Sequence, residues 1–456
     1  MKRQSVILIF DVGKTNKKIL LFDTHYRLVF ESSVQLPEIK DEDGFPCEDV
    51  HALTNWIKVA FEKILSDERF EVKAVNFSAY GASFVYVDEN LYPVLTLYNY
   101  LKPYPDSQKT TFYEQYEGET EFSKTTASPV LGSLNSGMQL FRLKKERPEI
   151  FAKIKYALHL PQYLSSIITK AAYSEITSIG CHTNLWNFKS NGYHDWVFQE
   201  GIKEKLPPIL KSDESFSLSH RDTQIAVGIG LHDSSSALIP YLASFHEPFV
   251  LLSTGTWCIS LNPFNNSTLS TQELENDCLC YLTYKGQPVK ASRLFAGYEH
   301  EQKVRQLADQ YNVSVDRITK TEYNSSATSM VISDGVLRKT KKVTSQLHPS
   351  DINELEEAEK AYHELIIEIV QKQMISTKLV LQGNIVKRIF IDGGFSKNNI
   401  YMNLMAAVFP EIEIYAASIA QASALGAALA IHRHWNNNSM PTELIDLKFF
   451  KDATID

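Results

Sequence analysis

The stretch SVILIFDVGKTNKKILLFD, residues 5–23, places apolar runs on both sides of a polar turn that contains Asp11, Gly13 and Thr15. This pattern predicts two β-strands, and the segment YRLVFES, residues 26–32, adds a third to a meander. A strand that ends in aspartate and turns through Gly and Thr brings a carboxylate, a hydroxyl and backbone N–H groups to one point. The turn therefore suits a phosphate with Mg²⁺, although a plain D-x-G hairpin has the same composition.

The same pattern returns in the second half of the chain as PFVLLS, TGT and WCISLN, residues 248–262. Further on, RIFID, GGFSKN and IYMNLMAAVF, residues 388–392, 393–398 and 400–409, indicate a strand, a glycine turn and a helix. Gly393 and Gly394 let the backbone approach a ligand, and a structural cap is the alternative. We therefore expect two similar α/β domains, residues 1–243 and 244–456.

Other segments predict helices or strands by their periodicity. Residues 51–66 and 361–376 place apolar side chains on one helical face, and 74–90 is predicted to be a β-hairpin. Residues 110–225 are expected to form a mainly helical elaboration of the first domain, with the stretch 148–169 interrupted by Pro161. The small-residue segment 417–434 predicts a helix that packs closely on a sheet, and the polar C-terminal tail is expected to be peripheral.

Composition narrows the function classes. The 456 residues carry a formal charge of −8, with Lys and Arg mixed among acids, which disfavours nucleic-acid binding. Apolar runs end quickly at charged residues, so we expect no membrane span or signal peptide and a cytoplasmic location. The five cysteines are odd in number and scattered, which is typical of reduced thiols, and the Cys278–Cys280 spacing does not predict a zinc site.

Asp233 lies in VGIGLHDSSSALIP, residues 227–240, between a glycine-rich stretch and the start of a predicted helix. A helix N-cap is one interpretation. The other is a general base, because phosphoryl transfer needs a carboxylate that orients the attacking hydroxyl and accepts its proton.

Together these motifs resemble the FGGY family of carbohydrate kinases, within the actin, Hsp70 and hexokinase superfamily. DVGKTNKK resembles the first phosphate motif, STGTW the second, and DGGFSKN with ASALGAALA the adenosine end. GLHDSSSA and MQLFRLKKERPEIF are similar to the rhamnulokinase and fuculokinase branch. The resemblance implies two actin-like (ribonuclease H-like) α/β domains with mixed sheets flanked by helices, an active site in the cleft between them, and transfer of phosphate from ATP with Mg²⁺ to a small (deoxy)ketose. Homodimers are a tendency of the family.

The resemblance also assigns roles to individual positions. Asp233 matches the catalytic base and Asp11 the metal-associated aspartate. The sugar side corresponds to Tyr80, Gly81, His232 and Asp233. The nucleotide positions are Lys14, Thr15, Asn16, Lys17, Lys18, Thr256, Gln302, Gly393 and Gly394.

Departures from the family pattern leave the sugar open. Tyr80 and Ser83 replace a tryptophan and an aspartate common in rhamnulokinases, and residues 98–106, YNYLKPYPD, lack the usual YRD pattern. Tyr80 either stacks on the sugar or packs in the core. Lys14 either contacts phosphate or points to solvent. An actin- or chaperone-like ATPase and a catalytically poor sugar sensor are the rival functions.

Overall fold

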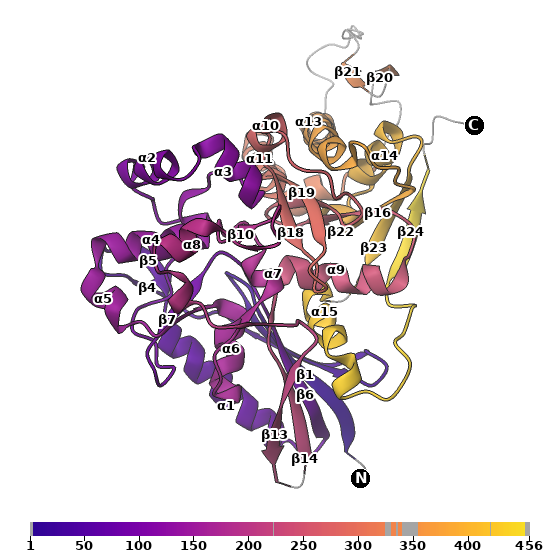
Figure 1. Cartoon of the computed structure of the whole chain (residues 1–456). Helices are drawn as coiled ribbons and strands as arrows, with labels where there is room; N and C mark the ends of the chain where they lie inside the picture. Colours follow the sequence, from indigo (N-terminus) through magenta and orange to yellow (C-terminus); the bar gives the residue numbers. More distant parts are fainter. Residues whose placement is uncertain are drawn as a thin grey trace, which may run out of the picture.

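The computed structural model describes residues 3–221, 223–323, 330–333, 336–339, 354–419 and 421–451. They form two α/β halves, each built on a seven-stranded mixed sheet, as the sequence predicts. In Figure 1 the first half, indigo to magenta, lies below and to the left of the orange and yellow second half, and helices α9 and α15 lie between the two sheets. Among the described residues, no helix combines the length and apolarity that crossing a membrane requires.

The first sheet has the strand order β13-β14-β6-β1-β2-β3, and β15 also pairs with β6. The meander predicted from the opening motif is confirmed, because β1, β2 and β3 pair antiparallel in sequence order. Its strands are β1 (Gln4–Val12), β2 (Lys17–Asp23), β3 (Leu28–Val34), β6 (Phe70–Ala79), β13 (Ser215–His220), β14 (Thr223–Gly228) and β15 (Leu231–His232).

The hairpin predicted over residues 74–90 does not form. Strand β6 pairs in parallel with β1, β14 and β15, so both of its edges are occupied within the sheet. Strand β7 (Phe84–Val87) instead pairs with β8 (Tyr156–His159). The stretch 148–169 also differs from expectation, because β8 separates α5 (Pro148–Lys153) from α6 (Leu160–Thr169), and Pro161 begins the second helix rather than interrupting one.

Alternating side chains give the first sheet two apolar faces. Val6, Leu8 and Phe10 face α1 (Val50–Ser66) and α6. Helix α1 forms as predicted, with Asp49 accepting hydrogen bonds from the first-turn amides. Ile7 and Ile9 face the opposite side, where the small residues of α15 (Ala422–Ala430) cover them. A helix from the second half thus completes the core of the first.

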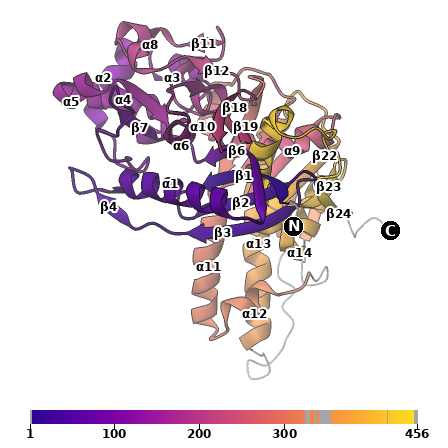
Figure 2. The same cartoon turned by 90° about the horizontal axis from the view of Figure 1, so that it is seen from below.

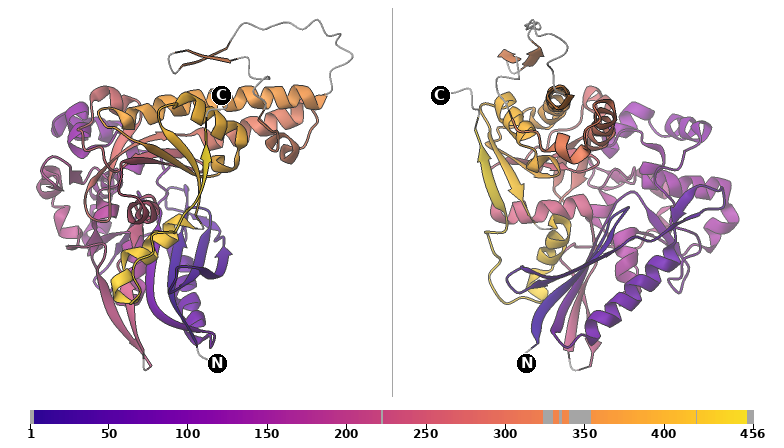
Figure 3. Two further views of the ribbon diagram at one scale, coloured as in Figure 1. Left: turned by 90° about the vertical axis from the view of Figure 1, so that its right-hand side faces the viewer. Right: turned by 180° about the vertical axis from the view of Figure 1, so that it is seen from behind.

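The second sheet has the order β18-β19-β17-β16-β22-β23-β24. One face packs against α11, α13 and α14, and the other against α9 (Asp233–Ser244). Figures 2 and 3 show α11 and α13 side by side, extending beyond the sheet. Its strands and these helices are β16 (Phe249–Thr254), β17 (Cys258–Asn262), β18 (Cys278–Leu282), β19 (Pro288–Leu294), β22 (Arg388–Gly393), β23 (Glu413–Ser418), β24 (Asp446–Phe450), α11 (Ala296–Gln310), α13 (Glu354–Leu381) and α14 (Asn399–Val408).

The C-terminal tail is more ordered than its polarity suggests, because β24 pairs antiparallel with β23 at the sheet edge. An aromatic-rich cluster around Phe112 and Trp196 forms the elaboration of the first half. The remaining elements are β4 (Glu38–Lys40), β5 (Pro46–Glu48), α2 (Asp106–Gln115), α3 (Glu119–Thr126), α4 (Ser136–Glu146), β9 (Ser174–Glu175), α7 (Ile176–Ile179), β10 (Trp186–Asn187), β11 (Gly192–Tyr193), α8 (Asp195–Gln199), β12 (Ile209–Leu210), α10 (Thr271–Glu275), α12 (Val315–Thr319), β20 (Met330–Ser333) and β21 (Val336–Lys339).

Helices α9 and α15 touch through their backbones. A Cβ added at Gly426 of α15 would lie 1.8 Å from the carbonyl oxygen of Ser236 in α9. The Ser236 hydroxyl also donates to the Ser423 carbonyl at 2.7 Å. Only glycine permits this approach, so the distance between the helices that cover the two sheets depends on one missing methyl group.

We therefore expect Gly426→Ala to destabilise the protein by about 2 kcal/mol, because the helices must separate to admit the methyl group. The free energy of unfolding, measured by urea titration, tests this. Gly192→Ala is the control, since no atom lies within 4 Å of its added Cβ. Equal stability of the two variants would contradict the backbone contact as a constraint.

Candidate functional site

The register of the first sheet gathers two predicted site residues at one edge. Asp11 near the end of β1 is opposite Ser78 of the parallel strand β6, and Ser78 is opposite Leu231 of the parallel strand β15. Asp233 follows β15 directly and begins α9. Because the carboxyl ends of parallel strands meet at one edge, the two aspartates approach each other, as in the ligand crevices of open α/β sheets.

Asp11 is a partly buried carboxylate with a raised pKa. Burial and the nearby charge of Asp233 raise its pKa to about 6, against smaller opposing effects of hydrogen bonds from Ser423 and Ser78 and the charge of Lys18. The Ser423 hydroxyl donates to Asp11 Oδ2 at 3.1 Å. A carboxylate whose proton affinity is raised by burial and by a neighbouring carboxylate forms a place where a cation is stabilised.

Asp233 is not the N-cap of α9. The capping position is His232, and Asp233 is the first helical residue. Its Oδ1 accepts hydrogen bonds from the amide and hydroxyl of Ser234, at 2.6 and 3.2 Å. Burial nevertheless raises its pKa to about 6, while 36% of the side chain remains exposed. A carboxylate with a pKa near neutrality that can still be reached by a ligand is suited to general base catalysis.

His232 and Gly81 lie against each other beside Asp233. Burial lowers the pKa of His232 to about 3, so its imidazole is neutral at physiological pH. Its Nε2 lies 3.2 Å from Asp233 Oδ1 and 3.3 Å from Cys181 Sγ. A Cβ at Gly81 would lie 2.9 Å from the imidazole. The glycine therefore leaves room for the histidine that contacts Asp233.

Tyr80 is buried, and its ring packs edge-to-face against Tyr100 at 5.9 Å. Its hydroxyl donates to Glu48 Oε1 at 2.7 Å. In this structure the side chain is thus part of the packed interior, with its polar end fully engaged.

The lysines of the first hairpin point to different sides of β2, as successive strand residues must. Lys17 is buried and pairs with Glu48 at 3.0 Å. Lys18 donates to Gln421 Oε1 at 2.9 Å on the side of Asp11. Lys14 pairs with Glu38 and Glu48 on the side of Lys17. Lys18 is therefore the hairpin lysine whose charge acts on Asp11.

The hairpin turn between β1 and β2 contains the other two predicted loop residues. Thr15 and Asn16 are exposed, and the Gly13 amide donates to the Asn16 carbonyl at 3.0 Å, which closes the turn. The Asn16 side chain accepts a hydrogen bond from Gln35 at 3.0 Å.

In the second half, Thr254 of β16 is opposite Gly393 of the parallel strand β22. A Cβ at Gly393 would lie 1.8 Å from the Thr254 carbonyl, and its φ of +82° also favours glycine. The Gly394 amide donates to that same carbonyl at 2.8 Å. Thr256 lies in the exposed β16–β17 turn, where its carbonyl accepts from the Tyr298 amide at 3.1 Å. The glycine turn and the second hairpin are thus locked together.

Two cavities meet at this turn. One of about 470 Å³ extends from Asp233 past Ser423 to Gly393 and Gly394. The other, about 340 Å³, is lined by residues that include Gly255, Gly297, His300, Tyr362, Gly394 and Asn398. Gly394 and Lys397 border both cavities, so an elongated ligand can run from Asp233 into the second half. Gln302 is half-buried on α11 and is not among the lining residues of either cavity.

Sequence reasoning missed several residues at this site. Ser423 lies within the segment that resembles the adenosine end of the family, but the resemblance predicts no function for it. Lys397 and Asn398 lie in the GGFSKN turn, and they too were not predicted as site residues. Glu48 had no motif signal at all, because tertiary contacts alone bring it to the hairpin lysines.

The donor set suits Mg²⁺. Within the described ranges, no group of three or more His, Cys, Asp and Glu side chains could hold a metal ion. Mg²⁺ usually needs only one or two carboxylates, with waters and substrate phosphates as its other ligands. Asp11, with Asp233 nearby, offers hard oxygen ligands beside the larger cavity, so these residues fit the ion.

Comparison with known proteins gives matches to both halves. The model of the N-terminal domain of the FGGY family of carbohydrate kinases matches residues 6–239, and that of the C-terminal domain matches residues 246–439. The rhamnulokinase of Halalkalibacterium halodurans is 28% identical over 266 residues, which are 54% of this chain and 52% of that protein. The matched region thus spans about half the length of that relative.

Solved structures share the fold along nearly the whole chain. A carbohydrate kinase from Novosphingobium aromaticivorans has a TM-score of 0.77 at 20% identity, covering 99% of this chain and 95% of its own. The ligand-bound xylulose kinase of Lactobacillus acidophilus has 0.77 at 16%, covering 98% and 94%. Plasmodium falciparum glycerol kinase with ADP has 0.72 at 16%, covering 95% and 90%. The predicted two-domain, actin-like fold is confirmed.

The locked glycine turn allows a test of whether the two cavities take a nucleotide. We expect Gly393→Ala to weaken binding of Mg·ADP by about tenfold or more, because the new Cβ displaces the Thr254 backbone. Isothermal titration calorimetry measures this. Gly383→Ala is the matched control, since Gly383 has a φ of +73° but no atom within 4 Å of its added Cβ. Similar losses in both variants would assign the effect to backbone strain alone.

Proposed function

The chain belongs to the FGGY family of carbohydrate kinases, and we propose that it transfers the γ-phosphoryl group of ATP to a hydroxyl of a small sugar. One observation carries the proposal. The reachable carboxylate of Asp233 and the glycine turn Gly393–Gly394 border the same cavity, so an acceptor hydroxyl and a nucleotide phosphate can meet there.

We propose a (deoxy)ketose such as L-rhamnulose or L-fuculose as the acceptor. The rhamnulokinase match supports this, as do GLHDSSSA and the residues around 138–151. The solved neighbours named for xylulose, gluconate and glycerol define the alternatives that a substrate screen must include.

In the proposed mechanism, the sugar lies beside Gly81 and His232, and Asp233 accepts the proton of the attacking hydroxyl. His232 is neutral, so it orients the Asp233 carboxylate without adding a charge that would lower its basicity. Ser234 holds Oδ1 through two hydrogen bonds, which leaves Oδ2 for the substrate. Geometry of this kind lets the base act on an aligned hydroxyl.

The phosphate side uses groups from both halves. Lys18, the amides of the first hairpin and the turn at Gly393–Gly394 are the proposed donors to phosphate oxygens. Asp11 would hold Mg²⁺, which neutralises charge on the phosphates when bound. Closure of the halves around the cleft would exclude water and limit hydrolysis of ATP.

A coupled ADP-release assay over ketoses, deoxyketoses, pentuloses, gluconate and glycerol tests the proposal. We expect L-rhamnulose or L-fuculose to stimulate ADP release most strongly. ADP release that ignores every sugar but depends on protein concentration would favour an assembly ATPase instead. Sugar binding without turnover would favour a sensor.

Asp233→Asn is expected to lower kcat by several orders of magnitude while Mg·ADP binding persists, because only proton acceptance is lost. The variant should be at least as stable to heat as the parent at pH 7. A raised carboxyl pKa means that the ionised group opposes folding, and this cost grows as pH rises from about 4 to 6. Near-normal phosphorylation by a folded variant would remove Asp233 from the role of base.

The pKa of Asp233 also predicts the pH dependence of the reaction. Since the base must be ionised, kcat/KM for the sugar should fall about tenfold for each pH unit below about 6 and level off above it. A pH profile at saturating Mg·ATP measures this. If kcat/KM instead fell only below about pH 4, the usual range of an exposed aspartate, the raised pKa of the base would be contradicted.

A further inference from the structure

One buried carboxylate that was not predicted as a site residue contacts both the first phosphate hairpin and the sugar side of the predicted site. Glu48, the last residue of β5, is 6% exposed. Its Oε1 accepts a hydrogen bond from the Tyr80 hydroxyl at 2.7 Å and lies 3.4 Å from Lys14 Nζ. Its Oε2 lies 3.0 Å from Lys17 Nζ. A single side chain thus contacts two lysines of the first hairpin and a tyrosine of the predicted sugar side.

The hairpin depends on this carboxylate for its shape. Lys17 is 1% exposed, so its ammonium group needs a buried counter-charge, which Glu48 supplies. The same ammonium group donates to the Lys14 carbonyl at 2.9 Å, and that carbonyl belongs to the turn. Glu48 therefore fixes the turn through Lys17 as well as through the side chain of Lys14.

On the sugar side, the connection continues toward the base. The Tyr80 ring packs edge-to-face on Tyr100. Burial and the charges of Asp233 and Glu48 raise the pKa of Tyr100, which places its hydroxyl within the field of both carboxylates. The packed tyrosine pair thus continues from the Glu48 hydrogen bond to a ring that the charge of Asp233 also reaches.

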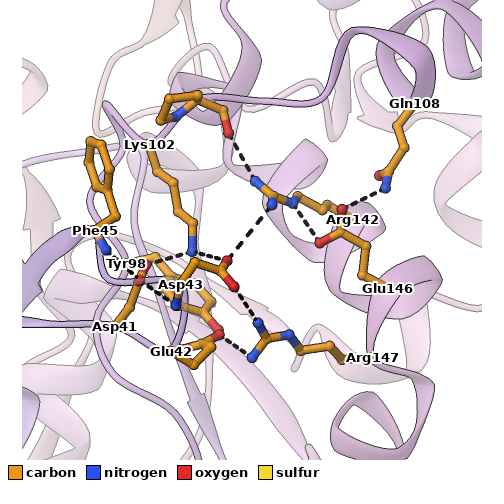
Figure 4. A network of polar contacts seen from close by, with 11 residues as sticks. Asp41, Glu42, Asp43, Phe45, Tyr98, Lys102, Gln108, Arg142, Glu146 and Arg147 are labelled. Atoms are coloured by element: carbon orange, nitrogen blue, oxygen red, sulfur yellow. Dashed lines mark hydrogen bonds and ion pairs between the residues drawn. The ribbon is translucent and has the colours of Figure 1, made fainter.

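A network of ion pairs, here called the ionic clamp, joins the turn before β5 to the segments that contain Lys102 and Arg147, as Figure 4 shows. Lys102 bridges Asp41 and Asp43 at 2.5 and 2.7 Å, and Arg147 bridges Glu42 and Asp43 at 2.5 and 2.8 Å. The three acids lie in the turn that leads into β5, and Lys102 follows Tyr100 by two residues. The cavity left inside the clamp is only about 30 Å³, so the ion pairs nearly fill the space.

We propose that Glu48 is a positioning residue, which sets the first phosphate hairpin at a fixed distance from the sugar side of the cleft. The inference rests on the proposed kinase function. Phosphoryl transfer depends steeply on the alignment of donor and acceptor, so a hairpin released from Glu48 would still admit the sugar but would hold the nucleotide phosphates less tightly and align them poorly.

The test separates positioning from folding with two variants. Glu48→Gln keeps an acceptor for Tyr80 but leaves Lys17 without its counter-charge, so it is expected to unfold at a lower temperature. The double variant Glu48→Gln/Lys17→Met removes both buried charges and should regain most of the lost Tm. We expect the double variant to keep a kcat about tenfold or more below the parent, with KM for the sugar changed by less than about threefold.

Glu38→Gln is the control, because Glu38 also pairs with Lys14 but is a largely exposed partner. Its kcat should stay within about twofold of the parent. Recovery of both Tm and kcat in the double variant would overturn the proposal, since Glu48 would then serve stability alone. If the parent phosphorylates no sugar, the kinase proposal fails. The positioning role of Glu48 is then tested separately, by calorimetric titration of each variant with the ATP analogue AMP-PNP in the presence of Mg²⁺. Weaker binding by the double variant than by the Glu38→Gln control supports hairpin positioning, and equal affinity overturns it.

Discussion

The backbone contact between α9 and α15 sets the geometry on which the rest of the molecule depends. Each helix covers the sheet of the opposite half, and they meet where Gly426 lies against Ser236. Asp233 begins α9, and Ser423, one turn before the contact, donates to Asp11. The register of the first sheet fixes the distance between the two aspartates, and the closeness of the helices sets the position of the Ser423 hydroxyl beside Asp11. Packing of the helices and electrostatics of the site are therefore coupled through Ser423.

Electrostatics at the site follow from the same arrangement. Two aspartates at the ends of β1 and β15, the strands that pair with β6 at this edge, are partly buried, and each has a pKa near 6. Lys18 is the hairpin lysine on their side, whereas Lys14 and Lys17 face Glu48. The hairpin thus divides its lysine charges between two sides, one beside Asp11 and one that contacts Glu48. This division explains why a run of three lysines in nine residues does not give a uniformly basic loop.

Much of the fold could be predicted from the sequence because its signals are local. Both glycine hairpins, α1 and α13 follow from apolar periodicity and turn residues, and Asp11, Asp233 and Gly393 lie next to such turns. The strands that pair with β6 and with β7 could not be predicted from local sequence. Both edges of β6 are occupied by strands that are distant in sequence. Strand β8, inside 148–169, was not predicted for the same reason, since its partner β7 lies some seventy residues earlier. Glu48 carries no motif, and its importance comes only from the groups that tertiary structure brings around it.

The exchange of helices between halves has a consequence for biosynthesis. The face of the first sheet formed by Ile7, Ile9, Leu20 and Phe22 is covered by residues 424–431, near the other end of the chain. During translation this apolar surface lacks its cover from α15 until residues 424–431 have left the ribosome. The first half cannot complete its core as an independent unit. A nascent chain halted before α15 would expose an apolar face of the first sheet to other proteins. Chaperone demand for such a molecule is therefore set by the order of its segments as much as by its overall stability.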